Sequence, residues 1–271
     1  MSADPSAPEG PLLVVSPHLH DAALSCAALL DRGEPVTVLD VCTLVPEPDR
    51  STEWDRRCGF SSAKDAMAAR EAEETEAYAD SAHEVLAVDL LEGQYRDDLR
   101  GPMDERRLHE AVSGWIDRHG GGTVVLPAGA GLTVGLAPGV WSRLRAALGG
   151  HRVVHADPDH LWTRDVVLQL LRGRTDVAVW LYEELPHSRS RPADAAVALV
   201  ADWSGRRAER VVLRVDRGRK AARLAAYTSQ MPAMFRGGTK RLARRVPADE
   251  RYWVLHPLGG DVRAADTAAA R

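Results

Sequence analysis

The sequence has few cysteines, little net charge and no long apolar run. Its three cysteines, Cys26, Cys42 and Cys58, are an odd number at spacings that suit neither a disulfide framework nor a zinc knuckle. We therefore expect them to pack in the core of a cytoplasmic protein. A net charge of -4 supplies no basic field, so nucleic acid is not an expected partner. The absence of an apolar run near ~18 residues excludes a membrane span.

The composition is that of one globular domain. Hydrophobic residues make up 45% and charged residues 27% of the 271 positions, close to the averages for globular proteins. We expect a single domain over residues 11–260, because α/β domains often reach this size as one unit. Residues 1–10 are polar and lack the pattern of a secretory signal, and residues 261–271 are rich in alanine. Both segments are expected to be loose tails.

Apolar runs of strand length alternate with helical patterns through the first two-thirds of the chain. This alternation is typical of a parallel sheet covered by helices on both faces. The expected strands lie at residues 12–15, 36–42, 85–91, 123–126 and 177–182. The expected helices lie at residues 21–31, 62–79, 104–119, 141–148 and 161–171.

The pattern changes in the last third of the chain. Residues 195–203 and 210–215 are apolar segments separated by a Ser-Gly pair, which predicts two antiparallel strands. A helix at 217–229 and a short strand at 252–255 are expected to close the fold. The prediction is an α/β fold with a mostly parallel sheet and an antiparallel C-terminal extension.

The first expected strand runs directly into the segment Ser-Pro-His-Leu-His-Asp, which ends at Asp21. In open parallel sheets, ligand sites lie beyond the carboxyl ends of the strands. His18 and Asp21 are three residues apart across a strand-to-helix turn, a spacing that lets both bind one divalent ion. The alternative is that they are ordinary turn residues, with the carboxylate near a helix N-terminus.

A second polar segment, Asp157-Pro158-Asp159-His160, lies just before an expected helix. One more imidazole from His160 would complete a His/Asp/His set. Three protein ligands leave the fourth position of a zinc ion open, as a catalytic zinc requires, although another divalent transition metal suits the same ligands. The alternative for His160 is a helix-start residue that bonds to the backbone.

These two segments resemble the motifs of the zinc-dependent N-acetylglucosaminylphosphatidylinositol de-N-acetylase-like family, which includes the mycothiol-pathway deacetylases and the LmbE-like (PIG-L) proteins. The family's first motif is a strand followed by His-Pro-Asp-Asp or a close variant, and its second is His-Pro-Asp-His before a helix. Weaker likenesses follow in the expected order at residues 54–60, 93–96, 182–186 and 227–230.

The resemblance implies a Rossmann-like three-layer sandwich in which His18, Asp21 and His160 hold zinc. It also implies a hydrolase that acts on a carbon–nitrogen bond and releases acetate from an N-acyl group. The expected substrate is a small molecule, an acetamido sugar, glycoconjugate or other specialised metabolite. The oligomeric state is left open.

The sequence departs from the family pattern at two polar positions. The family's general base, the first Asp of the Asp-Asp pair, is replaced by His20, and the first His of the second motif is replaced by Asp157. We hypothesise that His20 and Asp157 form a hydrogen-bonded pair in which His20 is an altered general base. Alternatively, His20 is a fourth metal ligand. The chain would then be a non-hydrolytic or degenerate family member with a binding or biosynthetic accessory role.

Two further residues are candidates for substrate binding. Arg70 matches a family segment whose arginine can contact substrate, although its acidic neighbours also fit a solvated charged surface. Trp54 can form the wall of a sugar pocket, or it can anchor a loop. Glu183 and Glu184 follow an expected strand and are candidates either to orient a ligand histidine or to cap a helix.

Overall fold

The computed structural model describes residues 8, 10–131, 156–189, 191–235 and 246–257. The helix expected at 141–148 lies outside the described residues, as do nearly all of the expected N-terminal tail and the whole of the C-terminal one.

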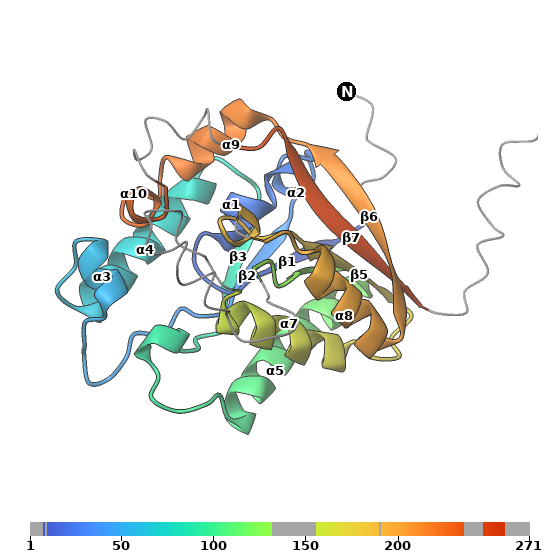
Figure 1. Ribbon diagram of the computed structural model, residues 1–271, viewed down its shortest axis with the longest axis horizontal. Coiled ribbons are helices and arrows are strands. Elements are labelled where there is room, and N and C mark those ends of the chain that lie inside the picture. The colour runs from blue at the N-terminus through green and yellow to red at the C-terminus, as the bar shows by residue number, and fades with distance from the viewer. Residues whose placement is uncertain (1–7, 9, 132–155, 190, 236–245, 258–271) are drawn as a thin grey trace, which may run out of the picture.

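Within the described chain, a seven-stranded sheet forms the middle layer, in the order β3-β2-β1-β4-β5-β7-β6 (Figure 1). Its strands are β1 (Leu12–Ser16), β2 (Thr37–Asp40), β3 (Glu84–Ala87), β4 (Gly122–Pro127), β5 (Val177–Tyr182), β6 (Arg206–Arg214) and β7 (Asp249–Pro257). The first five are parallel to one another, whereas β7 is antiparallel to both β5 and β6. The predicted α/β fold with an antiparallel C-terminal part is confirmed.

Helices cover both faces of this sheet, so the molecule has three layers. One face carries α1 (Asp21–Ser25), α2 (Ala27–Leu30), α4 (Ala63–Tyr78), α9 (Arg217–Leu224) and α10 (Met231–Met234). The other face carries α5 (Pro102–His119), α7 (Pro158–Leu170) and α8 (Asp194–Ser204). The short helices α3 (Glu53–Arg57), η1 (Gly93–Tyr95) and η2 (His187–Arg189) lie in the connections. The described helices include none that is long and apolar enough to cross a membrane.

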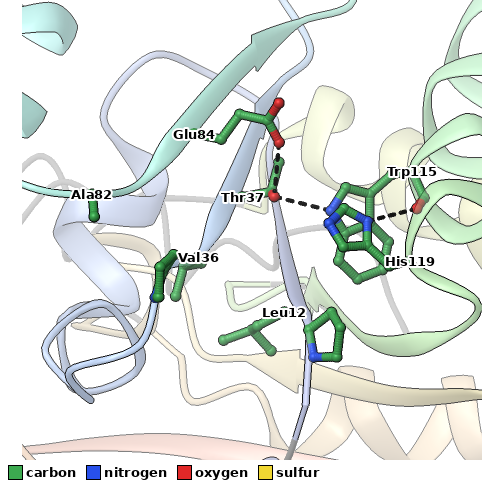
Figure 2. A pocket seen from close by; sticks show the side chains of 9 residues that line it. Leu12, Val36, Thr37, Ala82, Glu84, Trp115 and His119 are labelled. Atoms are coloured by element: carbon green, nitrogen blue, oxygen red, sulfur yellow. Dashed lines mark hydrogen bonds between the residues drawn. The ribbon is translucent and has the colours of Figure 1, made fainter.

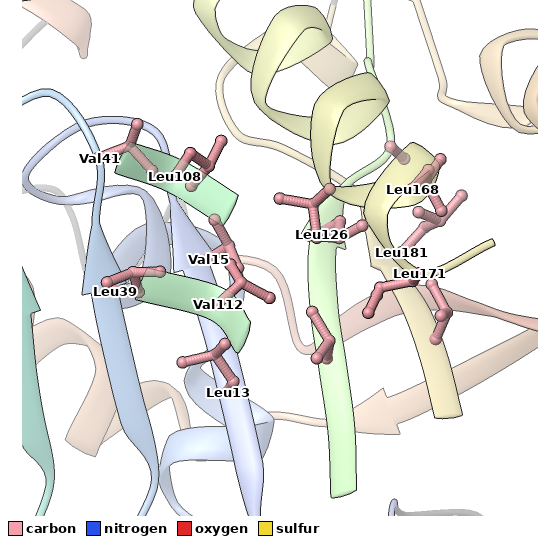
Figure 3. Close-up of a cluster of buried hydrophobic side chains, with 14 of the residues drawn as sticks. Leu13, Val15, Leu39, Val41, Leu108, Val112, Leu126, Leu168, Leu171 and Leu181 are labelled. Atoms are coloured by element: carbon pink, nitrogen blue, oxygen red, sulfur yellow. The ribbon is translucent and has the colours of Figure 1, made fainter. Parts of the chain in front are cut away.

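The central strands are buried on both sides, which explains their unbroken apolar sequence. Leu13 and Val15 of β1 point to the core under α5 and α7, where Leu108 and Val112 of α5 meet them (Figure 3). Leu12 and Val14 point to the opposite core. This alternation fixes the register of β1 and therefore the direction in which the polar turn after it leaves the sheet.

The strand expected at residues 195–203 is wrong, because this segment forms helix α8. Its buried residues Ala196, Val197 and Val200 have helical spacing, and Gly205 ends the helix in the left-handed region at φ 63°. Strand β6 begins directly after this glycine and pairs with β7. The antiparallel strands of the sheet are thus β6 and β7.

Other boundaries also differ from the expectation. Strand β3 ends at Ala87 instead of residue 91, and α7 begins at Pro158 instead of residue 161. The helix expected at 21–31 is broken at Cys26, where φ is -127°, into α1 and α2. The helix expected at 217–229 ends at Leu224.

A cavity of about 290 Å³ lies at the amino-terminal edge of the sheet (Figure 2). The indole of Trp115 donates a hydrogen bond of 2.9 Å to the hydroxyl of Thr37, which in turn donates one of 3.1 Å to Glu84. Leu12 and Val36, at or next to the starts of β1 and β2, line the same cavity. It is therefore at the opposite edge from the polar segments that follow the strands.

Candidate metal centre

His18, Asp21 and His160 converge at the carboxyl-terminal edge of the sheet. The Nε2 of His160 lies 3.0 Å from the Oδ2 of Asp21 and 3.3 Å from the Nδ1 of His18, and that Nδ1 is 3.5 Å from the same Oδ2. Around a tetrahedral zinc with bonds of about 2.0–2.1 Å, neighbouring ligand atoms are ~3.3 Å apart. The three donor atoms therefore have the separations that a zinc ion needs.

The fold explains why residues 142 positions apart in the chain meet here. Strand β1 is flanked by β2 and β4, and the chain leaves β1 toward one side of the sheet and returns to the other. Ligand sites of open α/β sheets lie at such a switch point. His160 is in the first turn of α7, where the carboxylate of Asp157 caps the helix by accepting a 2.8 Å hydrogen bond from the amide of Asp159.

Glu184 holds the imidazole of His160. Its Oε1 lies 3.4 Å from the Nδ1 of His160, and its two oxygens accept hydrogen bonds from the amides of Gly129 and Ala130. The carboxylate thus draws the ring proton to Nδ1 and leaves Nε2 free for a metal. Of the two glutamates considered, Glu184 takes this position, whereas Glu183 accepts a hydrogen bond from the amide of Ala193, next to the start of α8.

Asp159 holds the imidazole of His18 in the same way, a role that the sequence did not reveal. Its Oδ2 is 3.2 Å from the Nε2 of His18, so Nδ1 is the nitrogen left for a metal. Asp159 is itself fixed by the Arg100 guanidinium at 2.6 Å and the amide of Gly93 at 2.7 Å. The only sequence signal was its position beside His160.

Carboxylates surround the two imidazoles of the site. Burial alone lowers the pKa of an imidazole, yet the Asp21 carboxylate raises the pKa of His160 to about 10. Asp159 and Asp21 likewise raise the pKa of His18 against the effect of burial. Carboxylates strong enough to hold protons on buried imidazoles also attract a divalent cation, which would replace those protons.

Cys42 forms a second group of potential ligands with His18 and Asp159. The guanidinium of Arg100 lies 3.1 Å from its sulfur as well as 2.6 Å from the Asp159 carboxylate. The positively charged Arg100 thus already contacts two of these three potential ligands. The set of His18, Asp21 and His160 is the one that fits a metal ion.

His20 is buried beside this centre, in a backbone conformation with φ 127° that side-chain-bearing residues rarely adopt. Its Nε2 lies 3.4 Å from the Oδ1 of Asp21, and its Nδ1 lies 3.2 Å from the amide nitrogen of Gln230. Burial lowers the pKa of His20 to about 4. Among the described residues, no hydrogen bond or ion pair joins His20 to Asp157, so the expected pair is not formed.

Arg70 is buried, with 2% of its surface exposed, and does not lie on a solvated charged surface. Its guanidinium bonds to Asp55 at 3.0 Å and to Glu92 at 2.9 Å, and Glu92 is 3.7 Å from the Nε2 of His18. Trp54 lies in α3, and the guanidinium carbon of Arg57 is 5.1 Å from the centre of the Trp54 ring. Substrate binding by Arg70 and Trp54 stays a prediction.

No protein-family model matches the chain, and no curated protein matches it by sequence. Among solved structures, it is similar to the A40926 pseudoaglycone deacetylase Dbv21, with a TM-score of 0.61 and 22% identity over 91% of this chain and 97% of that one. The teicoplanin deacetylase Orf2 is similar in its zinc-inhibited form (TM-score 0.61, 23% identity). A deacetylase triple mutant of the teicoplanin biosynthetic pathway gives a TM-score of 0.62 and 26% identity. Each of these two alignments covers 90% of this chain and 97% of the other.

A hydratase has the same fold. GalB, the 4-carboxy-2-hydroxymuconate hydratase of Pseudomonas putida, has a TM-score of 0.56 and 12% identity over 92% of this chain and 97% of its own. The fold is therefore shared by deacetylases and a hydratase, and the fold alone does not determine the reaction.

Proposed function

We propose that the protein is a zinc-dependent N-deacetylase that acts on an acetamido sugar of a glycosylated specialised metabolite. The observation that carries the proposal is the convergence of His18, Asp21 and His160 at the switch point of the sheet, with both imidazoles backed by carboxylates. The similarity to deacetylases named for teicoplanin and A40926 supports the substrate class. Its three cysteines are free; Cys26 and Cys42 are buried, as expected of core residues, whereas Cys58 is only partly buried. A cytoplasmic location is part of the proposal.

His18, Asp21 and His160 would hold the zinc. When bound, zinc at this position would supply a Lewis acid that activates water and polarises the acetamide carbonyl. Glu184 and Asp159 hold the proton of the ring nitrogen that faces away from the ion and keep both rings oriented. His20 and Asp157 stand where the resembling family has its base and its second histidine, so in this proposal they are the residues that act on the reacting groups in place of that pair.

Substrate recognition is proposed to involve Arg70 and Trp54. Arg70 reaches the centre through Glu92, so it fixes the shape of the site's wall rather than presenting a free charge. Trp54 offers a flat apolar surface in α3, which suits stacking against a sugar ring.

A second candidate function is that of a non-hydrolytic member with a binding or accessory role. The observation that favours it is the imidazole of His20, whose Nε2 is close to Asp21 and could occupy the position that a hydrolase leaves for water. The similarity to a hydratase shows that the fold accommodates other chemistry.

The test combines metal analysis with a deacetylation assay. Purified protein should contain one zinc per chain and release acetate from N-acetylglucosaminyl glycosides, with the free amine detected by mass spectrometry. His160→Ala should lose both zinc and activity, whereas His256→Ala, at a partly exposed position in β7, should keep both. Stoichiometric zinc without acetate release would favour the accessory function, and absence of zinc would overturn the metal centre.

A further inference from the structure

The amide of Gln230 determines which nitrogen of His20 carries the proton. Gln230 lies between α9 and α10 and is 2% exposed. Its Nε2 is 3.3 Å from the carbonyl oxygen of Leu19 and 3.2 Å from the Nδ1 of His20. A carbonyl oxygen only accepts hydrogen bonds, so the atom facing Leu19 is the amide NH2 group and not the amide oxygen.

The same NH2 group therefore donates to the Nδ1 of His20. A ring nitrogen can accept this bond only through its lone pair, which leaves the single proton of a neutral imidazole on Nε2. That Nε2 lies 3.4 Å from the Oδ1 of Asp21 without a hydrogen bond between them among the described residues, and the Oδ2 of Asp21 belongs to the proposed metal-ligand set. A protonated ring nitrogen can neither bind a metal nor accept a proton, but it can donate a hydrogen bond.

The backbone supports this position of the ring. His20 holds a φ of 127° and a ψ of -20°, a strained conformation that residues with a side chain rarely adopt. Its carbonyl accepts a 2.8 Å hydrogen bond from the amide of Leu24 in α1, and its ring lies against Tyr227 with centres 6.5 Å apart. The strained turn thus places the Nε2–H beside the centre.

We propose that Gln230 holds His20 as a neutral imidazole protonated at Nε2, which donates a hydrogen bond to the substrate's carbonyl oxygen as negative charge develops there. The inference rests on the proposed deacetylation and assigns His20 neither the role of base nor that of fourth ligand. The donor keeps its proton throughout. A partly exposed carboxylate, Asp157, then accepts the proton of the attacking water and passes it to the amine as the carbon–nitrogen bond breaks and acetate forms.

The first experiment reads the tautomer directly. Nitrogen-15 NMR of histidine-labelled, zinc-loaded protein should show His20 protonated at Nε2, its signal being assigned by loss in His20→Gln. Gln230→Glu should move the proton to Nδ1, because a carboxylate accepts where the amide donates. Gln169→Glu, an exposed change on α7, is the matched control and should leave the signal in place. A wild-type His20 whose Nε2 is unprotonated or bound to metal would overturn the proposal.

The second experiment separates a donor from a base. A glutamine at position 20 can donate a hydrogen bond but cannot accept a proton at neutral pH, whereas a leucine can do neither. We expect His20→Gln to retain kcat within about tenfold of wild type and His20→Leu to lose about 10²–10³-fold, the usual effect of removing an oxyanion donor. Equal losses in both variants, at unchanged zinc content, would overturn the donor role.

The two proposals fail in different ways. A zinc-loaded wild-type protein that releases no acetate from any N-acetyl probe would overturn the deacetylase function and with it the catalytic part of this inference. An active enzyme whose His20 is protonated at Nδ1 would overturn the role of Gln230 and leave the deacetylase function standing.

Discussion

Each imidazole of the metal centre is held by a carboxylate that is itself fixed by other groups. Glu184 is tied to two backbone amides and Asp159 to a guanidinium and an amide. This arrangement fixes the orientation of both rings, and it keeps a proton on the nitrogen that faces away from the ion, so that a metal displaces only the proton of the other nitrogen. The entropy lost in orienting the two imidazoles is then lost during folding and not during metal binding. The metal affinity therefore depends in part on residues that do not contact the ion.

Removal of the charge on Glu184 should therefore weaken zinc binding. We expect Glu184→Gln to bind zinc about 10–100-fold more weakly than wild type, because the glutamine no longer holds the Nδ1 proton of His160 with a full charge. Competition with a chromophoric chelator measures the affinity. Glu183→Gln is the adjacent control and should bind zinc as wild type does, since Glu183 faces Ala193 and Arg251. Equal affinities in all three proteins would contradict the role given to Glu184.

The sequence predicted the three residues of the candidate metal centre more completely than the residues that support them. Local sequence pattern predicts where strands end and helices begin. The candidate ligands lie at such positions: His18, Asp21 and His160. Asp159 could be noticed in the sequence because it stands next to His160. Its contact with His18, however, spans 141 residues and depends on how two layers of the fold pack. Gln230 meets His20 across 210 residues, and no local pattern encodes such a contact.

Asp40, at the end of β2, is a buried carboxyl group outside the metal-ligand set. Neither of its oxygens has a hydrogen-bond partner among the described residues, since the hydroxyl of Ser16 donates to the carbonyl of His18. Burial, with a contribution from the charge of Asp21, raises the pKa of Asp40 to about 8. Glu74, on α4, is also buried with one unpartnered oxygen.

The folded protein thus binds a proton at Asp40 that the unfolded chain releases near its ordinary pKa of about 4. Stability should fall as pH rises from about 4 to about 8, by at most ~1.4 kcal/mol per pH unit from this group. Asp40→Asn should remove that slope, so the variant gains on wild type with rising pH. Urea unfolding at several pH values measures the difference, and the exposed Asp80→Asn should show none. A difference between Asp40→Asn and wild type that does not change with pH would contradict the account.

At the scale of elements, the parallel half of the sheet was easier to predict than the C-terminal part. The run Val-Ala-Val-Trp-Leu-Tyr of β5 lies at its predicted residues, because β-branched and aromatic residues favour strands. The alanine-rich segment of α8 has a similar hydrophobicity but a helical composition, and its length exceeds that of most strands. For this segment, the amino-acid composition and the length were better predictors of secondary structure than the apolar run.

A buried ion pair joins three elements on the other face of the sheet. Lys220 of α9 is fully buried and its Nζ lies 2.6 Å from Glu250 of β7. Glu250 also accepts hydrogen bonds from the amides of Ala27 and Ala28 at the start of α2, and from the hydroxyl of Tyr252. One carboxylate thus positions α9, β7 and α2 together, immediately after the α1 helix that begins at the metal centre.

Loss of the lysine charge should destabilise the fold strongly. Lys220→Met leaves Glu250 buried without a counter-charge, which we expect to lower the free energy of unfolding by about 3–5 kcal/mol. Combining it with Glu250→Gln should recover part of that loss, because the stranded charge is gone. Arg214→Met, which removes an exposed ion pair with Asp249 between β6 and β7, should cost less than about 1 kcal/mol. Urea unfolding tests all of these, and a loss below about 1 kcal/mol in Lys220→Met would contradict the expectation.

At the scale of the whole molecule, the candidate metal centre brings together segments from distant parts of the chain. The turn after β1 and the first turn of α7 belong to different crossovers on opposite faces of the sheet. The two segments meet at the carboxyl edge, where the Oδ2 of Asp21 lies 3.0 Å from the Nε2 of His160. A metal ion bound there therefore adds a cross-link between the two outer layers of the fold.

Zinc should accordingly raise the unfolding temperature of the entire domain. A ligand that binds only the folded state at 100 times its dissociation constant stabilises by about 2.7 kcal/mol, which in a chain of this size corresponds to a rise of about 5 °C. Calorimetry of chelator-treated protein, with and without added zinc, measures the shift. His160→Ala should show no zinc-dependent shift, whereas His256→Ala should show the full one. Because the ligands come from both outer layers, the transition should move as one peak. A zinc-dependent splitting into two transitions would mean that the layers unfold separately and that the ion does not bridge them.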